Sequence, residues 1–128
     1  MHAKGVITRK SQYPVKESID RLETFLSAHG ATIYARINQQ AEVNNAGGDL
    51  QPLEFILFGN PKAGGPLMAE NPLIALDLPL KVIAWEDDQK EVWLAYNEAA
   101  YIEDRYSLPD VENSPLVLDH VIDMVLKK

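Results

Sequence analysis

The spacing of apolar and polar residues switches along the chain between the period of a strand and that of a helix. Gly5 to Lys10 is short and contains β-branched residues, which indicates an opening strand. After it, apolar residues recur at helical spacing, with charged residues between them: Val15, Ile19, Leu22, Phe25 and Leu26. Pro14 suits the first turn of this predicted helix, and Gly30 suits the position just beyond its end.

The middle of the chain predicts two strands separated by a short helix. Residues 31–37 alternate, which favours a half-buried strand with one apolar face formed by Ile33, Ala35 and Ile37. Asn38 is suited to capping a short helix through Val43. Leu53 to Phe58 is continuously apolar apart from Glu54, which is typical of a central strand covered on both faces.

A glycine-rich stretch and a hairpin follow. Residues 59–66 read as a loop after the strand, and residues 66–70 as one or two turns of helix. Residues 80–85 and 91–96 predict two strands joined around the polar segment 87–90.

The last part of the chain predicts two helices separated by an irregular segment. The first runs from about Asn97 to Arg105, residues 107–113 are irregular, and Ser114-Pro115 reads as the cap and first residue of the final helix. The element order is β-α-β-(α)-β-α-β-β-α-α. It predicts an α+β fold, with a mostly antiparallel sheet packed against helices in a single domain over residues 1–128.

Composition narrows the classes of partner. The 19 acidic and 12 basic residues give a net charge of −7, which repels phosphate backbones, so we expect no nucleic-acid partner. The absence of cysteine excludes disulfides and zinc–thiolate sites. No run approaches the roughly 20 apolar residues of a membrane span. We therefore expect a soluble protein without membrane insertion. The cytoplasm is the expected compartment, although an exported protein whose signal peptide had been removed would look the same.

The glycine-rich stretch has the first part of a phosphate-binding loop. Its Gly-x₄-Gly spacing fits, but Gly65-Pro66 replaces the Lys-Ser/Thr pair that holds phosphates and magnesium, which argues against nucleotide hydrolysis of that type. Backbone N–H groups around Gly64 and Gly65, together with Lys62, remain a candidate anion site. The alternative is that these glycines only form turns with positive φ and let two backbones approach closely.

Lys81 is the unexpected cation of the predicted hairpin. A two- or four-residue loop would place Lys81 opposite Tyr96, at the end of a strip formed by Ile83 with Leu94 and Trp85 with Val92. In that position Lys81 would extend to solvent, pair with a carboxylate such as Asp77, or bind a ligand. A register slipped by one residue would change its partners.

The histidines do not form a recognisable metal site. His2, His29 and His120 lie on separate predicted elements. His120 and Asp123 share a helix face, but two ligands do not close a metal site. We therefore expect no metal and no cofactor.

Several short motifs resemble one known family. They are Gly59-Asn60-Pro61, Gly64, Pro66-Leu67-Met68, Leu78-Pro79, Lys81, Trp93 and Tyr96-Asn97. Together they resemble the signature of DUF302, a bacterial and archaeal domain of unknown function. The resemblance implies an α+β fold that assembles as a homodimer, in cytosolic and exported members, and it implies no established activity. Asn38-Gln39 stands where many relatives have Asp-His, and Gly65 where they tend to have threonine, which weakens an enzymatic interpretation.

Three functional hypotheses remain. The first is a dimeric module that binds a small anionic or amphipathic ligand through Asn60, Lys62, Gly64, Gly65, Lys81, Tyr96 and Asn97. The second is a structural or protein-interaction domain without a ligand. The third is an enzyme that uses Lys81, Tyr96 or Asp77. Self-association is predicted because residues 66–80 and the hairpin carry more apolar surface than one small sheet covers.

Overall fold

The computed structural model describes residues 3–108 and 114–127. Its elements, in chain order, are β1 (Val6–Ser11), α1 (Val15–Ala28), β2 (Thr32–Asn38), α2 (Gln39–Asn45), β3 (Leu53–Gly59), α3 (Pro61–Glu70), the 3₁₀ helix η1 (Pro72–Leu76), β4 (Leu80–Glu86), β5 (Val92–Asn97), α4 (Ala99–Arg105) and α5 (Asp119–Leu126). The strands form one sheet in the order β1-β5-β4-β3-β2, and every neighbouring pair is antiparallel. The predicted α+β class is confirmed.

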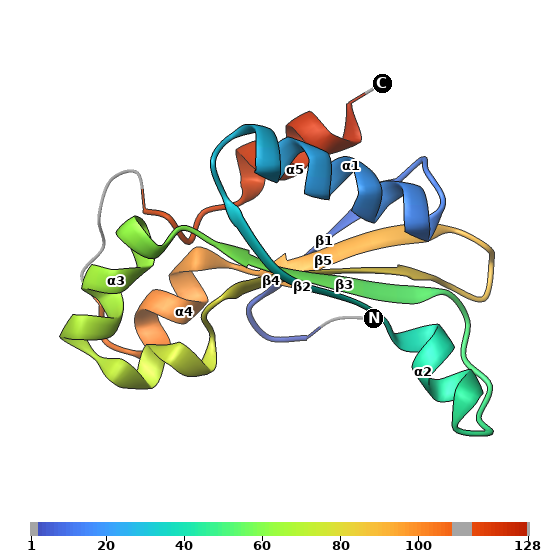
Figure 1. The fold of residues 1–128 in the computed structure, drawn as a ribbon, viewed down its shortest axis with the longest axis horizontal. Helices are drawn as coiled ribbons and strands as arrows, with labels where there is room; N and C mark the ends of the chain where they lie inside the picture. The colour runs from blue at the N-terminus through green and yellow to red at the C-terminus, as the bar shows by residue number, and fades with distance from the viewer. Residues whose placement is uncertain (1–2, 109–113, 128) are drawn as a thin grey trace.

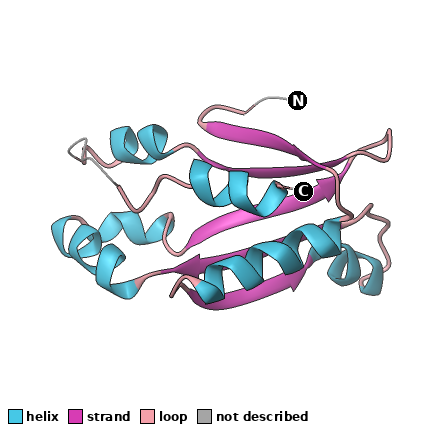
Figure 2. Ribbon diagram, turned by 90° about the horizontal axis from the view of Figure 1, so that it is seen from above, coloured by secondary structure: helices cyan, strands magenta, loops and turns pink. Residues whose placement is uncertain are grey.

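Helices α1 and α5 cover one face of the sheet, which we call the covered face (Figures 1 and 2). The core lies between them and the strands. It includes residues that are fully shielded from solvent: Ile19 and Leu22 of α1, Ile122 of α5, and Ile56, Val82 and Leu94 of the sheet. The apolar spacing that predicted α1 is therefore the side of the helix that packs on the sheet.

Polar side chains fasten the two helices to the strands. Arg36 of β2 binds Asp20 of α1 at 2.6 Å and the buried Glu54 of β3 at 3.0 Å. On the other side, the Tyr96 hydroxyl of β5 donates a hydrogen bond to Asp119 of α5 at 2.8 Å. The buried charge and the buried phenol therefore both have partners, as burial requires.

The second face, which we call the bare face, has no helix over its middle within residues 3–108 and 114–127. In Figure 1, α2 lies past one end of the sheet, and η1 and α4 lie past the other end. The register assigns to it Ala35 and Ile37 of β2, Leu53, Phe55 and Leu57 of β3, Lys81, Ile83 and Trp85 of β4, and Trp93, Ala95 and Asn97 of β5. The described helices thus cover only one face of β3, although Phe55 on the other face is also buried.

Side chains on the bare face lie against one another. The rings of Trp85 and Trp93 stack with their centroids 6.5 Å apart, and the Lys81 ammonium lies 4.5 Å from the centroid of the Phe55 ring. These contacts leave Trp85 and Trp93 only half-buried. An apolar layer therefore remains partly open to solvent.

Strand β2 contains a bulge that the alternating sequence did not reveal. Its pairing with β3 shifts between Ile33 and Ala35, so Tyr34 is the extra residue. A bulge moves the following side chains to the opposite face. Ile33 therefore packs on the core, whereas Ala35 and Ile37 lie on the bare face, and the predicted single apolar face is wrong.

The hairpin register differs by one residue from the expected one. Val82, not Lys81, lies opposite Tyr96. The loop between the paired residues Asp87 and Glu91 has three residues, and its last residue, Lys90, has a φ of 66°. A type I turn followed by a left-handed residue is a common three-residue hairpin loop. The odd loop length places Lys81 and Tyr96 on opposite faces of the sheet.

Asp87 stabilises this loop. One of its carboxylate oxygens accepts hydrogen bonds from the N–H groups of Gln89 and Glu91, both at 2.9 Å, and the other accepts from the indole N–H of Trp93 at 2.9 Å. The bond from Trp93, followed by those from the backbone, lowers the pKa of the Asp87 carboxyl. These hydrogen bonds fix the conformation of the loop. The polar composition of residues 87–90 predicted a turn there, but not its length.

The final helix begins later than predicted. Ser114 does not cap it, because the Ser114 hydroxyl accepts from the Leu116 N–H within a turn and α5 starts at Asp119. Leu116 and Leu118, which precede α5, are buried. Of the segment expected to be irregular, residues 109–113 lie outside the described residues.

Candidate functional site

Helix α3 includes the glycine-rich stretch that the sequence predicted as a loop. Asn60 is its N-cap and Pro61 its first residue, a favourable start that outweighs two helical glycines. Neither Gly64 nor Gly65 has a positive φ, so the alternative that they form left-handed turns is also wrong. The predicted loop is therefore a helix that begins five residues earlier than expected.

Asn60 organises the first turn of α3. Its side-chain oxygen accepts from the Lys62 N–H at 3.0 Å, in an Asx-type arrangement. The Asn60 carbonyl accepts from the N–H groups of Ala63 at 3.0 Å and Gly64 at 2.8 Å. These N–H groups already have intramolecular acceptors, so the start of α3 offers little to an anion.

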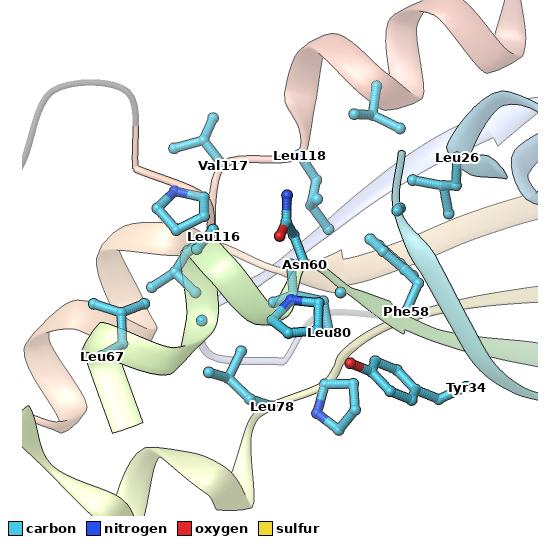
Figure 3. A pocket seen from close by; sticks show the side chains of 18 of the residues that line it. Leu26, Tyr34, Phe58, Asn60, Leu67, Leu78, Leu80, Leu116, Val117 and Leu118 are labelled. Atoms are coloured by element: carbon cyan, nitrogen blue, oxygen red, sulfur yellow. The ribbon is translucent and has the colours of Figure 1, made fainter. Parts of the chain in front are cut away.

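One side of α3 faces an apolar pocket of about 300 Å³ at the end of the sheet (Figure 3). Its walls come from α1, β2, β3, α3, the segment between η1 and β4, and the segment before α5. We call it the apolar pocket and define it by Leu26, Phe58, Leu67, Leu78, Leu80 and Leu118, with Asn60 and Gly64 in its wall. Elements distant in sequence thus meet around one hydrophobic space.

The apolar pocket has polar groups but no charged lining residue. Within the described residues, no Asp, Glu, Lys or Arg lines it; Asn60, Tyr34 and His29 do. His29 is committed elsewhere, because its Nδ1 lies 2.8 Å from the Phe25 carbonyl and its ring stacks on Phe25. The pocket therefore suits an apolar ligand.

A second hollow shares part of its lining with the apolar pocket, because residues 78–80 and Leu118 line both. We call it the Lys81 groove; it is lined also by Leu57, Leu76, Asp77, Asn97 and Lys81. Asp77, the expected partner of Lys81, instead accepts hydrogen bonds from the Arg105 guanidinium at 3.1 Å and from the Tyr106 hydroxyl. The hydrogen bond to Asp77 and burial raise the pKa of Tyr106. Lys81 reaches solvent over Phe55.

Tyr96 belongs to neither hollow. It is 4% exposed on the covered face, and burial together with the bond to Asp119 raises its pKa to about 12. A phenol with this pKa stays protonated at neutral pH. It does not converge with Lys81 or Asp77, which an enzyme using these three residues would require.

The seven predicted site residues therefore do not form one site. Asn60 and Gly64 line the apolar pocket, Lys81 and Asn97 line the Lys81 groove, and Lys62, Gly65 and Tyr96 line neither. Sequence reasoning did not select Tyr34 or Leu118. Tyr34 gave no signal because it occupies the bulge of β2, and Leu118 looked like an ordinary apolar residue of the final helix.

Two further features bear on the kind of site. Among the side chains of residues 3–108 and 114–127, no group of three or more His, Asp or Glu is placed to hold a metal ion. None of the helices in that part of the chain combines the length and apolar character that a membrane crossing requires.

Comparison with known proteins identifies the family. A family model described as "Domain of unknown function DUF302" matches residues 7–125, nearly the whole chain. The chain belongs to the DUF302 family. The DUF302 fold is also seen in the crystal structure of an uncharacterized conserved DUF302 protein from Bacillus stearothermophilus, with a TM-score of 0.79 over 97% of each chain. The two sequences are 18% identical, so this likeness concerns the fold alone.

Similar curated proteins carry a functional name. The DUF302 chain is 38% identical over 104 residues, 81% of its length, to proteins named "Fluoride-specific ion channel FluC 1" from Brucella suis biovar 1 and Brucella abortus biovar 1. The match covers 41% of the first protein and 38% of the second. The chain thus spans about two fifths of the length of these relatives.

Proposed function

We propose that this DUF302 domain is a homodimer that binds a small amphipathic molecule, with the ligand's apolar part in the apolar pocket. The observation that supports this most is the pocket itself. Its volume of about 300 Å³ lies at the lower end of the range for small-molecule sites. Its largely hydrophobic lining, with a few polar groups, is the usual composition of such a site.

The amphipathic ligand is favoured over a purely anionic one by the state of α3. The N–H groups of Lys62 and Gly64 are bonded to Asn60, and the described lining of the apolar pocket holds no cation. Burying an anion without a cation or free donors is unfavourable. The ligand's apolar part therefore occupies the pocket, and any charge stays at its mouth.

The homodimer is supported by the amount of exposed surface. The chain exposes 7966 Å² at a mass of 14.3 kDa, whereas a folded monomer of this mass exposes about 6,800 Å². The bare face is partly open, and Leu73 and Leu76 of η1 are 63% and 74% exposed. A second copy related by a two-fold axis would cover these residues together.

Ligand binding is tested by fluorescence titration with two dyes, the uncharged phenylnaphthylamine and the amphipathic anion anilinonaphthalene sulfonate. We expect saturable binding of at least one dye, at one per chain. Val117 lines the pocket and is 51% exposed, so Val117→Arg leaves the core intact while placing a charge at the pocket. This variant should weaken binding of the uncharged dye. Non-saturable fluorescence in the wild type would contradict the proposal.

A second candidate function is binding of fluoride or another small anion in the Lys81 groove. Two observations favour it: the similarity to proteins named as fluoride-specific channels, and the presence of Lys81 and Asn97 in one hollow. Melting temperatures in fluoride and in chloride at equal ionic strength test it. A stabilisation specific to fluoride that disappears in Lys81→Met would support this candidate, and equal melting temperatures would oppose it.

A further inference from the structure

Gly64 and Gly65 are adjacent in α3, but the space next to each of them is different. Glycine is among the least favourable residues inside a helix, and neither Gly64 nor Gly65 has a positive φ that would require it. A Cβ on Gly64 would lie 3.8 Å from Leu78 and 3.9 Å from Met68, which are ordinary contact distances, and a Cβ on Gly65 would meet nothing within 4 Å. Neither backbone conformation nor close packing therefore explains these glycines.

Only one of the two glycines borders the apolar pocket. Gly64 lines it, with Leu67 and Leu78 nearby, whereas Gly65 does not. A side chain on Gly64 would extend from the wall into the volume that a ligand occupies. The missing side chain of Gly64 thus determines the size of the pocket.

Two polar groups of the pocket have unused hydrogen-bonding capacity. Among the described residues, no partner is present for the Tyr34 hydroxyl, which belongs to a residue that is 49% exposed, or for the amide nitrogen of the exposed Asn60, whose oxygen alone accepts from the Lys62 N–H. Figure 3 shows the Tyr34 hydroxyl directed toward Leu78 and Leu80, and the Asn60 amide between Leu80 and Leu118. Both groups can donate a hydrogen bond.

We propose that Gly64 sets the upper size limit of the ligand. We also propose that the ligand is an uncharged molecule with an apolar body and one carbonyl-type acceptor, to which the Tyr34 hydroxyl donates. This inference rests on the proposed function, and it makes that function specific. An acceptor on the ligand takes the place of water at the half-exposed Tyr34 hydroxyl, and an uncharged body avoids burying a charge where the described lining offers no counter-charge.

The size limit is tested with the uncharged naphthalene ketone prodan, by titration of wild type, Gly64→Leu and the matched control Gly65→Leu. We expect Gly64→Leu to weaken prodan binding by about tenfold or more, because the added side chain fills the pocket. Gly65→Leu adds the same side chain outside the pocket, and should bind within about twofold of wild type. Denaturation curves establish that each variant is folded. If Gly64→Leu does not fold, Gly64→Ala places one methyl group there at contact distance, and should weaken binding by about twofold to threefold.

The acceptor is tested with Tyr34→Phe and two uncharged dyes. Removing the hydroxyl should weaken the binding of prodan, which has a carbonyl, by about fivefold to tenfold. The affinity for phenylnaphthylamine, which has no carbonyl, should stay within about twofold of the wild-type value. Equal losses for both dyes would overturn the acceptor, and equal prodan affinity of folded Gly64 and Gly65 variants would overturn the size limit. Wild type that binds phenylnaphthylamine but not prodan would contradict this inference while leaving the proposed function standing. Wild type that binds no dye would contradict both.

Discussion

The two faces of the sheet are built from the same strands, but they are covered differently. On the covered face, Ile56, Val82 and Leu94 are fully buried under α1 and α5. On the bare face, Trp85 and Trp93 are only half-buried, and Lys81, which lies over Phe55, is exposed. Strand alternation therefore provides two apolar faces, while the described helices cover only one of them. The covered face therefore forms the core, and the half-buried tryptophans support our proposal that a second chain covers the bare face.

The largest expected effect concerns the covered face. Leu94→Ala removes a fully buried side chain of β5 and should lower the free energy of unfolding by about 2–5 kcal/mol, because the surrounding core cannot close the cavity. The matched change on the bare face is Ile83→Ala, at a half-buried position of β4. Under dilute conditions that favour the monomer, Ile83→Ala should lower the free energy of unfolding clearly less than Leu94→Ala does. Equal losses in urea denaturation would show that the two faces do not differ as described.

Two ion pairs of the protein differ in how deeply they are buried. Arg36→Met removes the partner of Glu54, which is buried on the covered face, and should cost roughly 3 kcal/mol because a buried carboxylate loses its cation. The matched control is Arg9→Met, whose partner Asp123 has a side chain that is 59% exposed. That change should cost less than about 1 kcal/mol. Urea denaturation at neutral pH measures both, and a small loss for Arg36→Met would contradict the burial of its network.

Alkaline pH tests the buried phenol of the covered face. The pKa of Tyr96 is raised to about 12 from its ordinary value of 10. Its stabilising contribution is therefore complete below pH 10 and is lost as the pH rises toward 12, by roughly 2 kcal/mol. Tyr96→Phe should remove this part of the decline in stability between those pH values. Parallel pH profiles of wild type and variant would show that Tyr96 ionises alike in the folded and unfolded chains.

The smallest effect is expected at Lys81. Its ammonium lies above the Phe55 ring and reaches solvent, so Lys81→Met should change stability by less than about 1 kcal/mol. A buried pair with Asp77 would instead cost about 3–5 kcal/mol when broken, but Asp77 is bound by Arg105 and Tyr106. A large loss of stability in chemical denaturation would show that Lys81 has a structural role on the bare face.

The sequence predicted those parts of the fold that local rules determine. Helix α1 followed from its apolar spacing, and α2 begins after Asn38, whose side chain accepts from the Ala41 N–H as a cap. Three features escaped because they depend on single residues in context. These are the bulge at Tyr34, the left-handed Lys90, and the start of α3 at Pro61 despite two glycines. Each of them changes which side chains share a face or a loop.

The candidate site was predictable only in part. Asn60 and Gly64 were selected from the glycine-rich stretch, and both line the apolar pocket. Lys81 and Tyr96 were placed together by a register that is off by one residue, and the structure separates them. Tyr34 and Leu118 come from distant segments, and only tertiary packing brings them to the pocket.

Sedimentation velocity at micromolar concentration tests most directly whether a second chain covers the bare face. We expect the wild type to sediment as a dimer of twice 14.3 kDa. Ile83→Glu, which places a charge in the middle of the bare face, should sediment as a folded monomer that still binds the dyes in the apolar pocket. A wild-type chain that sediments at 14.3 kDa under the same conditions would contradict the proposed role of the bare face.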